Sequence, residues 1–135
     1  MCKRYLGSCH CGAVAFEASV DLSRGTTKCN CSICTKLRNW TVQVEPSAFY
    51  LAGGASDLSV YRGNNPVAHH FFCSHCGVHP FARVDMPNMS GMTYYNVNVA
   101  CLDGVDVDVL VTAPMSFRDG RNDNWGSEPS ETRHL

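Results

Sequence analysis

The chain has 135 residues, of which 44% are hydrophobic and 17% are charged. This composition excludes an intrinsically disordered chain, and the length is typical of one domain with its own core. Eleven basic and twelve acidic residues leave a formal net charge of −1. That balance excludes a global attraction to nucleic acid or to an anionic membrane surface, so we expect neither kind of partner.

The expected strands follow one another along the whole chain, because most apolar segments alternate with a period of two residues. In chain order they cover residues 12–20, 40–45, 49–51, 58–62, 67–72, 79–84 and 94–100. Alternation places Val14, Phe16 and Ala18 on one face of the first strand. Residues 105–111 are ambiguous, since their alternation favours a strand but a short helical turn after Asp103 and Gly104 is the alternative.

Many short strands without a long helical period predict a single mainly β domain. Such a fold usually closes as a sandwich or a barrel-like pair of sheets. We expect the domain to cover residues 1–125. The last ten residues, 126–135, are polar and are expected to form a frayed or loosely docked C-terminal tail.

The two ends of the chain and its cysteines predict a compartment. The N-terminal residues contain no apolar run of about 7–15 residues typical of a secretory signal. No stretch approaches the roughly 20 apolar residues of a membrane span. We therefore expect a cytoplasmic location, where thiols stay reduced. The nine cysteines, an odd number, then indicate metal ligands rather than a disulfide framework.

Seven of the nine cysteines form three clusters with metal-ligand spacing. The clusters are a C-x-C of Cys9 and Cys11, a C-x-C-x-x-C of Cys29, Cys31 and Cys34, and a C-x-x-C-G of Cys73 and Cys76. Alternate residues of an extended segment point the same way, so a C-x-C presents both sulfurs to one ion. A C-x-x-C does the same across a tight turn. Zinc suits such thiolates and prefers four of them in a tetrahedron.

The number of sulfurs predicts two different zinc sites. The first and third clusters together supply the four ligands of a closed structural site. The central cluster has three cysteines and would leave a fourth position open, as catalytic zinc sites do. Spacing alone leaves the pairing open, because Cys29 and Cys31 could equally pair with Cys73 and Cys76. Another alternative is that all clusters are structural and that Cys101 or a histidine completes the second site.

At these motifs the sequence closely resembles the glutathione-dependent formaldehyde-activating enzyme family, which also includes centromere protein V. The resemblance is carried by GSCHCGAVAFE (residues 7–17), CNCSICTK (29–36), HHFFCSHCGVHPFAR (69–83) and VNVACLDGVD (97–106). A looser match, FRDGRNDNW, covers residues 117–125. Together these segments extend over nearly the whole chain.

The resemblance implies a β-tent fold of short antiparallel sheets, held together by a four-cysteine zinc site. It assigns the structural zinc to Cys9, Cys11, Cys73 and Cys76, and the catalytic zinc to Cys29, Cys31 and Cys34. The implied activity is the addition of glutathione to formaldehyde, which gives S-hydroxymethylglutathione. The enzyme class is a carbon–sulfur lyase.

Charged residues and one histidine are candidates to support this chemistry. Zinc with three thiolates has a charge of −1, and a fourth thiolate makes −2, so nearby cations are needed. Lys28, Lys36 and Arg38 flank the central cluster and could supply them. The sequence also offers two arginines for the carboxylates of glutathione and one histidine as a proton shuttle. These three are Arg62, Arg83 and His79.

The sequence thus predicts a zinc-dependent enzyme that joins glutathione or a similar thiol to formaldehyde or another small aldehyde. Two zinc ions per chain are expected, with small-molecule thiol and aldehyde partners. The alternative is a zinc-stabilised binding module without catalysis, in which every metal ion is fully coordinated by the protein.

Overall fold

A computed structural model describes residues 1–63, 65–86 and 91–135 as two β-sheets with short helices between their strands. The smaller sheet is antiparallel with the order β1-β2-β5, formed by β1 (Lys3–Ser8), β2 (Ala15–Val20) and β5 (Phe49–Gly53). The larger sheet has the order β10-β3-β4-β9-β8-β7-β6. Its strands are β3 (Thr26–Cys29), β4 (Trp40–Val44), β6 (Leu58–Tyr61), β7 (Ala68–Cys73), β8 (Phe81–Met86), β9 (Met92–Asn98) and β10 (Met115–Arg118).

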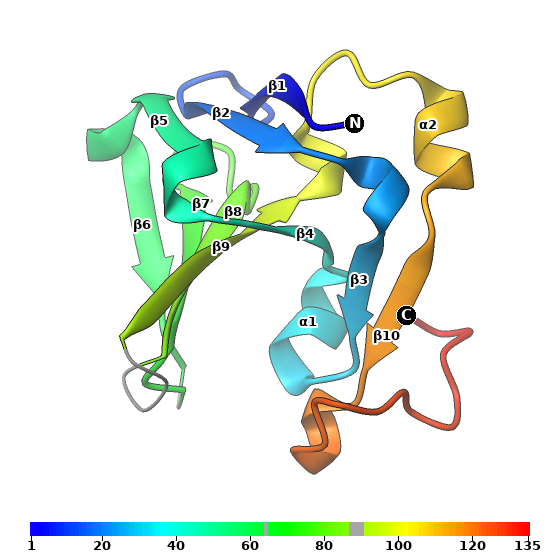
Figure 1. Ribbon diagram of the computed structural model, residues 1–135. Helices are drawn as coiled ribbons and strands as arrows, with labels where there is room; N and C mark the ends of the chain where they lie inside the picture. The colour runs from blue at the N-terminus through cyan, green and yellow to red at the C-terminus, as the bar shows by residue number, and fades with distance from the viewer. Residues whose placement is uncertain (64, 87–90) are drawn as a thin grey trace.

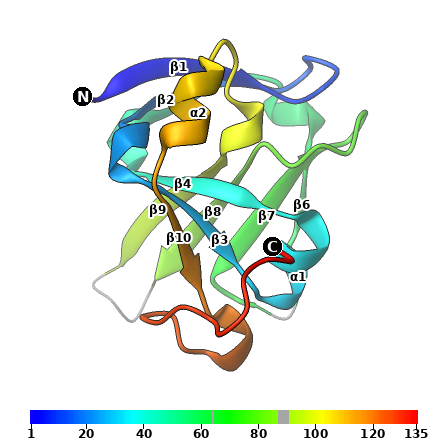
Figure 2. The ribbon, with the colours of Figure 1, turned by 90° about the vertical axis from the view of Figure 1, so that its right-hand side faces the viewer.

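The larger sheet is strongly curved. Its neighbouring strands are antiparallel except for β10 and β3, which are parallel. The smaller sheet lies across the top of this curve in Figure 1, and the short helix α1 (Ser32–Leu37) lies beside β3. Figure 2 shows the C-terminal segment running back toward β3 and α1. The prediction of a mainly β fold with antiparallel sheets is confirmed.

The core lies between the two sheets and is built from alternating positions. Phe16, Ala18 and Val20 of β2 are buried, whereas the residues between them are half-exposed. The ring of Phe16 lies 5.7 Å from that of Phe49, and the ring of Phe49 lies 4.1 Å from that of Tyr95. The second contact joins the smaller sheet to the larger one. The burial of alternate residues confirms the expected alternation in the first strand.

The ambiguous segment at residues 105–111 resolves as a helix, α2 (Val107–Thr112). The strand favoured by its alternation is therefore wrong. Asp106 begins the helix, because its carboxylate accepts a hydrogen bond from the backbone N–H of Asp108 at 3.0 Å. Such a cap satisfies a helix N–H that has no partner within the helix. Val107 and Val111 remain exposed, so the alternating valines do not mark a buried face.

Several boundaries differ from the expected ones for local reasons. The first expected strand begins at Ala15 rather than at residue 12, because Gly12 has a φ of 81° in the preceding turn. The last expected strand ends at Asn98, whose side chain caps the 3-10 turn Val99–Cys101. Strands β1, β3 and β10 have no counterpart among the sequence predictions. Neither helix in the described ranges has the length and hydropathy that crossing a membrane requires.

Candidate functional site

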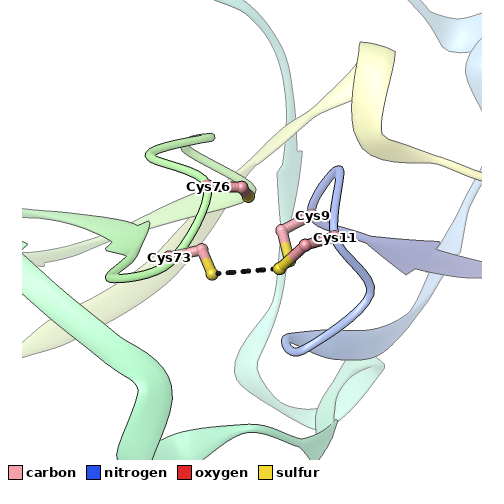
Figure 3. A group of neighbouring side chains, drawn as sticks. All are labelled: Cys9, Cys11, Cys73 and Cys76. Carbon is pink, nitrogen blue, oxygen red and sulfur yellow. Dashed lines mark hydrogen bonds between the residues drawn. The ribbon is translucent and has the colours of Figure 1, made fainter.

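The first candidate metal centre is a four-sulfur group made of Cys9, Cys11, Cys73 and Cys76. All four sulfur atoms lie within 4.8 Å of one another. Cys9 and Cys11 come from the loop between β1 and β2, Cys73 ends β7, and Cys76 lies in the turn that follows. Figure 3 shows the two pairs facing each other. The structure therefore pairs the first cluster with the third and leaves the central cluster by itself.

The dimensions of the four-sulfur group suit a tetrahedral metal ion. The Sγ of Cys11 lies 3.7 Å from those of Cys9 and Cys73. A tetrahedron with metal–sulfur bonds of about 2.3 Å has edges of about 3.8 Å. The backbone N–H of Val14 donates to Cys9 Sγ at 3.3 Å, which stabilises a thiolate there. The pKa of Cys76 is lowered to about 6, chiefly by backbone N–H groups of Val78 and Cys11.

The second candidate centre is a three-sulfur group made of Cys29, Cys31 and Cys34, whose sulfur atoms also lie within 4.8 Å of one another. Cys29 ends β3, Cys31 is the N-cap of α1, and Cys34 lies in the helix. All three are half-buried. The helix brings Cys34 back over the cap residue, because residues three apart in a helix lie on the same side. In the described part of the chain, no fourth Cys, His, Asp or Glu belongs to this group.

Crowding of the three sulfurs gives them unequal proton affinities. The thiols of Cys29 and Cys34 donate to Cys31 and lower its pKa. The pKa of Cys34 is raised by Cys29 and Cys31, and that of Cys29 is raised chiefly by Cys31. Without a metal ion, the group therefore holds one thiolate and two thiols. A bound cation would replace the two shared protons.

Asn30 holds the loop that carries Cys29 and Cys31, although the sequence analysis did not single it out. Its Nδ2 donates to Asp119 Oδ1 at 2.7 Å, and its Oδ1 accepts from the backbone N–H of Arg121 at 2.9 Å. Its backbone carbonyl accepts from Thr35 Oγ1 at 3.0 Å and from Arg121 Nε at 3.1 Å. Asn30 is 7% exposed. The only sequence signal for Asp119, its side-chain partner, was that Asp119 lies in the FRDGRNDNW segment.

Gly120 and Trp125 form a wall beside Cys29. A Cβ added at Gly120 would lie 2.5 Å from the Trp125 ring and 2.7 Å from Cys29 Sγ. The backbone of the turn Gly120–Asn122 therefore lies directly against the three-sulfur group. The indole Nε1 of Trp125 donates to Asp123 Oδ1 at 2.7 Å, which orients the ring. A side chain at position 120 would be incompatible with this packing.

The three cations that flank the central cluster differ in their surroundings. Lys28 Nζ donates to the backbone oxygen of Leu135 at 3.0 Å, and Arg38 Nη1 donates to that of His134 at 3.2 Å. Lys36 is exposed on α1. The C-terminal residues thus contact the elements that carry the three-sulfur group, and their last residue, Leu135, is half-buried.

The two arginines expected to hold glutathione carboxylates are engaged elsewhere. Arg62 Nη2 donates to the carbonyl of Pro66 at 2.6 Å, within the connection between β6 and β7. Arg83 Nε lies 3.4 Å from Asp85 Oδ2. Arg83 is not among the residues that line the small cavity next to α1.

The small cavity between α1 and the strands β7 to β9 is lined partly by His70, His79 and Asn96. Its volume of about 10 Å³ is close to the lower limit for one ordered water. His79 Nδ1 is buried without a hydrogen-bond partner among the described atoms. Burial lowers the pKa of both histidines, and the Cys31 charge opposes this shift at His70. Of the two, His70 is the histidine whose pKa is partly raised by the charge of Cys31.

The remaining cysteines belong to neither group of sulfurs in the described residues. Cys101 is buried, and its Sγ lies 3.9 Å from the carbonyl oxygen of His79. Burial, with a contribution from Asp103, raises the pKa of Cys101 to about 11. Cys101 does not complete the three-sulfur group in this structure. Cys2 is an exposed thiol just before β1.

Comparison with known proteins places this arrangement in a family. Residues 4–114 match the family model described as glutathione-dependent formaldehyde-activating enzyme. The chain belongs to this family. A crystal structure of a Rhodobacter sphaeroides protein is similar, with a TM-score of 0.68 and 30% sequence identity over 82% of this chain and 99% of that chain.

Proposed function

We propose that the chain is a zinc-dependent enzyme that joins glutathione or a similar thiol to formaldehyde or another small aldehyde. In the reverse direction it acts as a carbon–sulfur lyase. The observation that carries the proposal is the three-sulfur group, because its ligand set leaves one tetrahedral position for a substrate. Family membership supports the same chemistry. The reduced thiols that it needs favour a cytoplasmic location.

The residues of both groups suit zinc. Thiolate sulfur is the ligand that zinc favours in structural sites. The sulfur separations of the four-sulfur group match its tetrahedral geometry, and the three sulfurs of the other group lie within 4.8 Å of one another. We propose a structural ion at the four-sulfur group and a catalytic ion at the three-sulfur group. At the latter, zinc would supply the substrate as a thiolate at neutral pH, since coordination removes the thiol proton.

The overall reaction forms one carbon–sulfur bond and opens the carbonyl double bond. The thiol loses its proton, and the former carbonyl oxygen gains one, so a proton must cross the site. We assign this transfer to His70 and His79, because both line the cavity next to α1 and burial lowers the pKa of both, which favours the neutral form that accepts a proton. Asn30 and Asp119 keep the cysteine loop in place, and the absence of a side chain at Gly120 lets its backbone pack against Cys29.

Zinc content and cobalt substitution test the proposal. We expect two zinc ions in the purified protein, with one of them responsive to glutathione. In the cobalt-substituted protein, glutathione should change the visible absorption of one ion and leave the other unchanged. Cys34→Ser should fold, keep one ion and lose the response, whereas Cys2→Ser, the control, should behave as wild type.

The catalytic reaction is then assayed with the same zinc-loaded protein. The exchange between free formaldehyde and its glutathione adduct, measured by NMR, should be faster with wild type than with Cys34→Ser. Two fully saturated ions that do not respond to thiols would contradict the proposal and favour the non-catalytic binding module.

A further inference from the structure

Arg118 ends the strand that lies beside Cys29, and the sequence analysis did not single it out. Strands β10 and β3 are parallel neighbours (Figure 1), and their register places Arg118 opposite Cys29. Two positions earlier on each strand, Ser116 Oγ and Thr27 Oγ1 lie 3.2 Å apart, so these two side chains share a face of the sheet. Because side chains return to the same face at every second residue of a strand, Arg118 and Cys29 share that face as well.

The backbone around Arg118 is fixed to the loop that carries the sulfurs. The carbonyl of Arg118 accepts a hydrogen bond from the backbone N–H of Asn30 at 3.2 Å. Two residues further on, a Cβ added at Gly120 would lie 2.7 Å from Cys29 Sγ. Neighbouring strands of a sheet lie about 4.8 Å apart, which is less than the length of an arginine side chain. The guanidinium of Arg118 can therefore reach the three-sulfur group.

The positive charge of Arg118 has no carboxylate partner in the described ranges, where no Asp or Glu lies within ion-pair distance of its guanidinium. The adjacent carboxylate, Asp119, accepts instead from the side-chain amides of Asn30 and Asn122. Arg121, the other cation of this segment, donates through Nε to the carbonyl of Asn30 at 3.1 Å. The exposed side chain of Arg118 is thus available to another anion.

The three-sulfur group gains negative charge when a thiol binds to it. Zinc with three thiolates has a charge of −1, and a fourth thiolate makes −2. All three cysteines are half-buried. A nearby positive charge stabilises an added anion more strongly in such a site than in bulk water, because the effective dielectric constant is lower.

We propose that Arg118 is the charge-balancing residue of the three-sulfur group, and that its guanidinium stabilises the negative charge that a bound thiolate adds. The inference rests on the proposed function for the identity of that anion. The stabilised charge is that of the sulfur itself. The effect should therefore extend to a thiol that carries no other charged group, such as 2-mercaptoethanol.

The first experiment follows the binding of 2-mercaptoethanol by the visible absorption of the cobalt-substituted full chain. Arg118→Gln should weaken binding about fivefold, at the upper end of the range for an exposed pair of charges. Arg118→Lys, which keeps the charge, should bind nearly as wild type. The loss in Arg118→Gln should shrink at about 1 M salt, because counterions screen the interaction. A purely structural role would show neither the rescue by lysine nor the dependence on salt.

Arg24→Gln is the matched control for this experiment, since it removes one exposed positive charge from the turn Leu22–Arg24, before β3. It should bind the thiol as wild type does. The metal content of each variant shows whether the ligand loop is intact. Equal affinities of Arg118→Gln and wild type, or an equal loss in Arg118→Lys, would overturn the inference.

A second experiment needs no thiol substrate. Two disulfide reagents attack cysteine sulfurs, the dianion 5,5′-dithiobis(2-nitrobenzoate) and the neutral 4,4′-dithiodipyridine. They are compared on the zinc-loaded chain with Cys2→Ser, which removes the exposed thiol outside both sulfur groups. Arg118→Gln should slow the release of the first zinc ion by the dianion about fivefold and leave the rate with the neutral reagent unchanged, because a local positive charge attracts anions. Arg24→Gln should change neither rate, and an unchanged rate with the dianion in Arg118→Gln would overturn the inference.

The two experiments separate the charge of Arg118 from the proposed function. If no thiol changes the cobalt absorption of wild type, the proposed function is wrong, and the two reagent rates decide the role of Arg118. If thiols bind the cobalt but Arg118→Gln changes neither their affinity nor the reagent rates, the role of Arg118 is wrong and the proposed function stands.

Discussion

The side-chain amide of Asn30 lies 2.7 Å from the carboxylate of Asp119, although 89 positions separate the two residues. Asn122 also donates to this carboxylate, with distances of 3.1 and 2.9 Å to its two oxygens. These bonds lower the pKa of Asp119, Asn122 contributing most, so the group is a carboxylate at neutral pH. The contact ties the loop between Cys29 and Cys31 to the segment after β10.

Removal of this contact should loosen the three-sulfur group. Asp119→Ala leaves the buried amide of Asn30 without its acceptor. We expect metal affinity at the three-sulfur group to fall about 10- to 100-fold, as is usual when a residue that orients a ligand loop is lost. Competition with a chromophoric chelator measures this affinity. Glu128→Ala, an exposed change in the next segment, is the control. An unchanged affinity in Asp119→Ala would show that the loop does not depend on the contact.

A single methyl group at position 120 should have a selective effect. In Gly120→Ala the new Cβ would meet the Trp125 ring at 2.5 Å and Cys29 Sγ at 2.7 Å. Overpacking of this kind costs about 1–3 kcal/mol. We expect the variant to retain metal at the four-sulfur group and to lose it from the three-sulfur group, as measured by metal content after dialysis. Gly126→Ala is the matched control, because nothing lies within 4 Å of its added Cβ. Full metal content in Gly120→Ala would contradict the prediction.

Metal removal should proceed in two steps with different consequences. Cys9 and Cys73 are buried, and the four-sulfur group joins the loop after β1 to the turn after β7. Because the binding energy of a structural metal site is also folding energy, its loss should unfold the chain. A chelator should first take the ion from the three-sulfur group with no change in far-ultraviolet circular dichroism, and the loss of the second ion should coincide with unfolding. Cys73→Ser should be far less stable than Cys34→Ser, and equal stability would contradict this division.

Proton release should accompany metal binding at the three-sulfur group. Because the pKa values of Cys29 and Cys34 are raised, these two thiols are protonated at neutral pH while Cys31 is not. We expect about two protons per ion at pH 7 and a metal affinity that falls as the pH is lowered, since protons compete with the metal. An indicator dye in weak buffer measures the release during a zinc titration. Cys34→Ser should release about one proton fewer, and an identical release would argue against Cys34 as a ligand.

Local patterns in the sequence predicted the features that depend on neighbours along the chain. Alternation in residues 14–20 identified the buried face of β2, since successive strand residues point to opposite sides. The same alternation misled at residues 105–111. There the carboxylate of Asp106 caps a helix instead. An alternating pattern alone does not show whether a helix cap or a neighbouring strand will decide the conformation.

Local sequence patterns did not predict the features that depend on contacts between distant segments. The sequence analysis named Lys28 and Arg38 as cations near the central cluster. The tail that binds them was expected to be frayed or loosely docked, because a polar composition does not reveal a partner 107 positions away. Likewise, the side of β8 on which Arg83 lies follows from its register with β7 and β9.

The sequence by itself determined the kinds of ligand and their local geometry. Two C-x-C and two C-x-x-C spacings present their sulfurs together because the positions are only two or three residues apart. The tertiary structure decided which motifs meet, as well as the position of Asn30 against Asp119 and of Leu135 against Lys28. These contacts depend on the order and register of ten short strands, and strands with similar alternating patterns can pair in many orders until the packed core selects one.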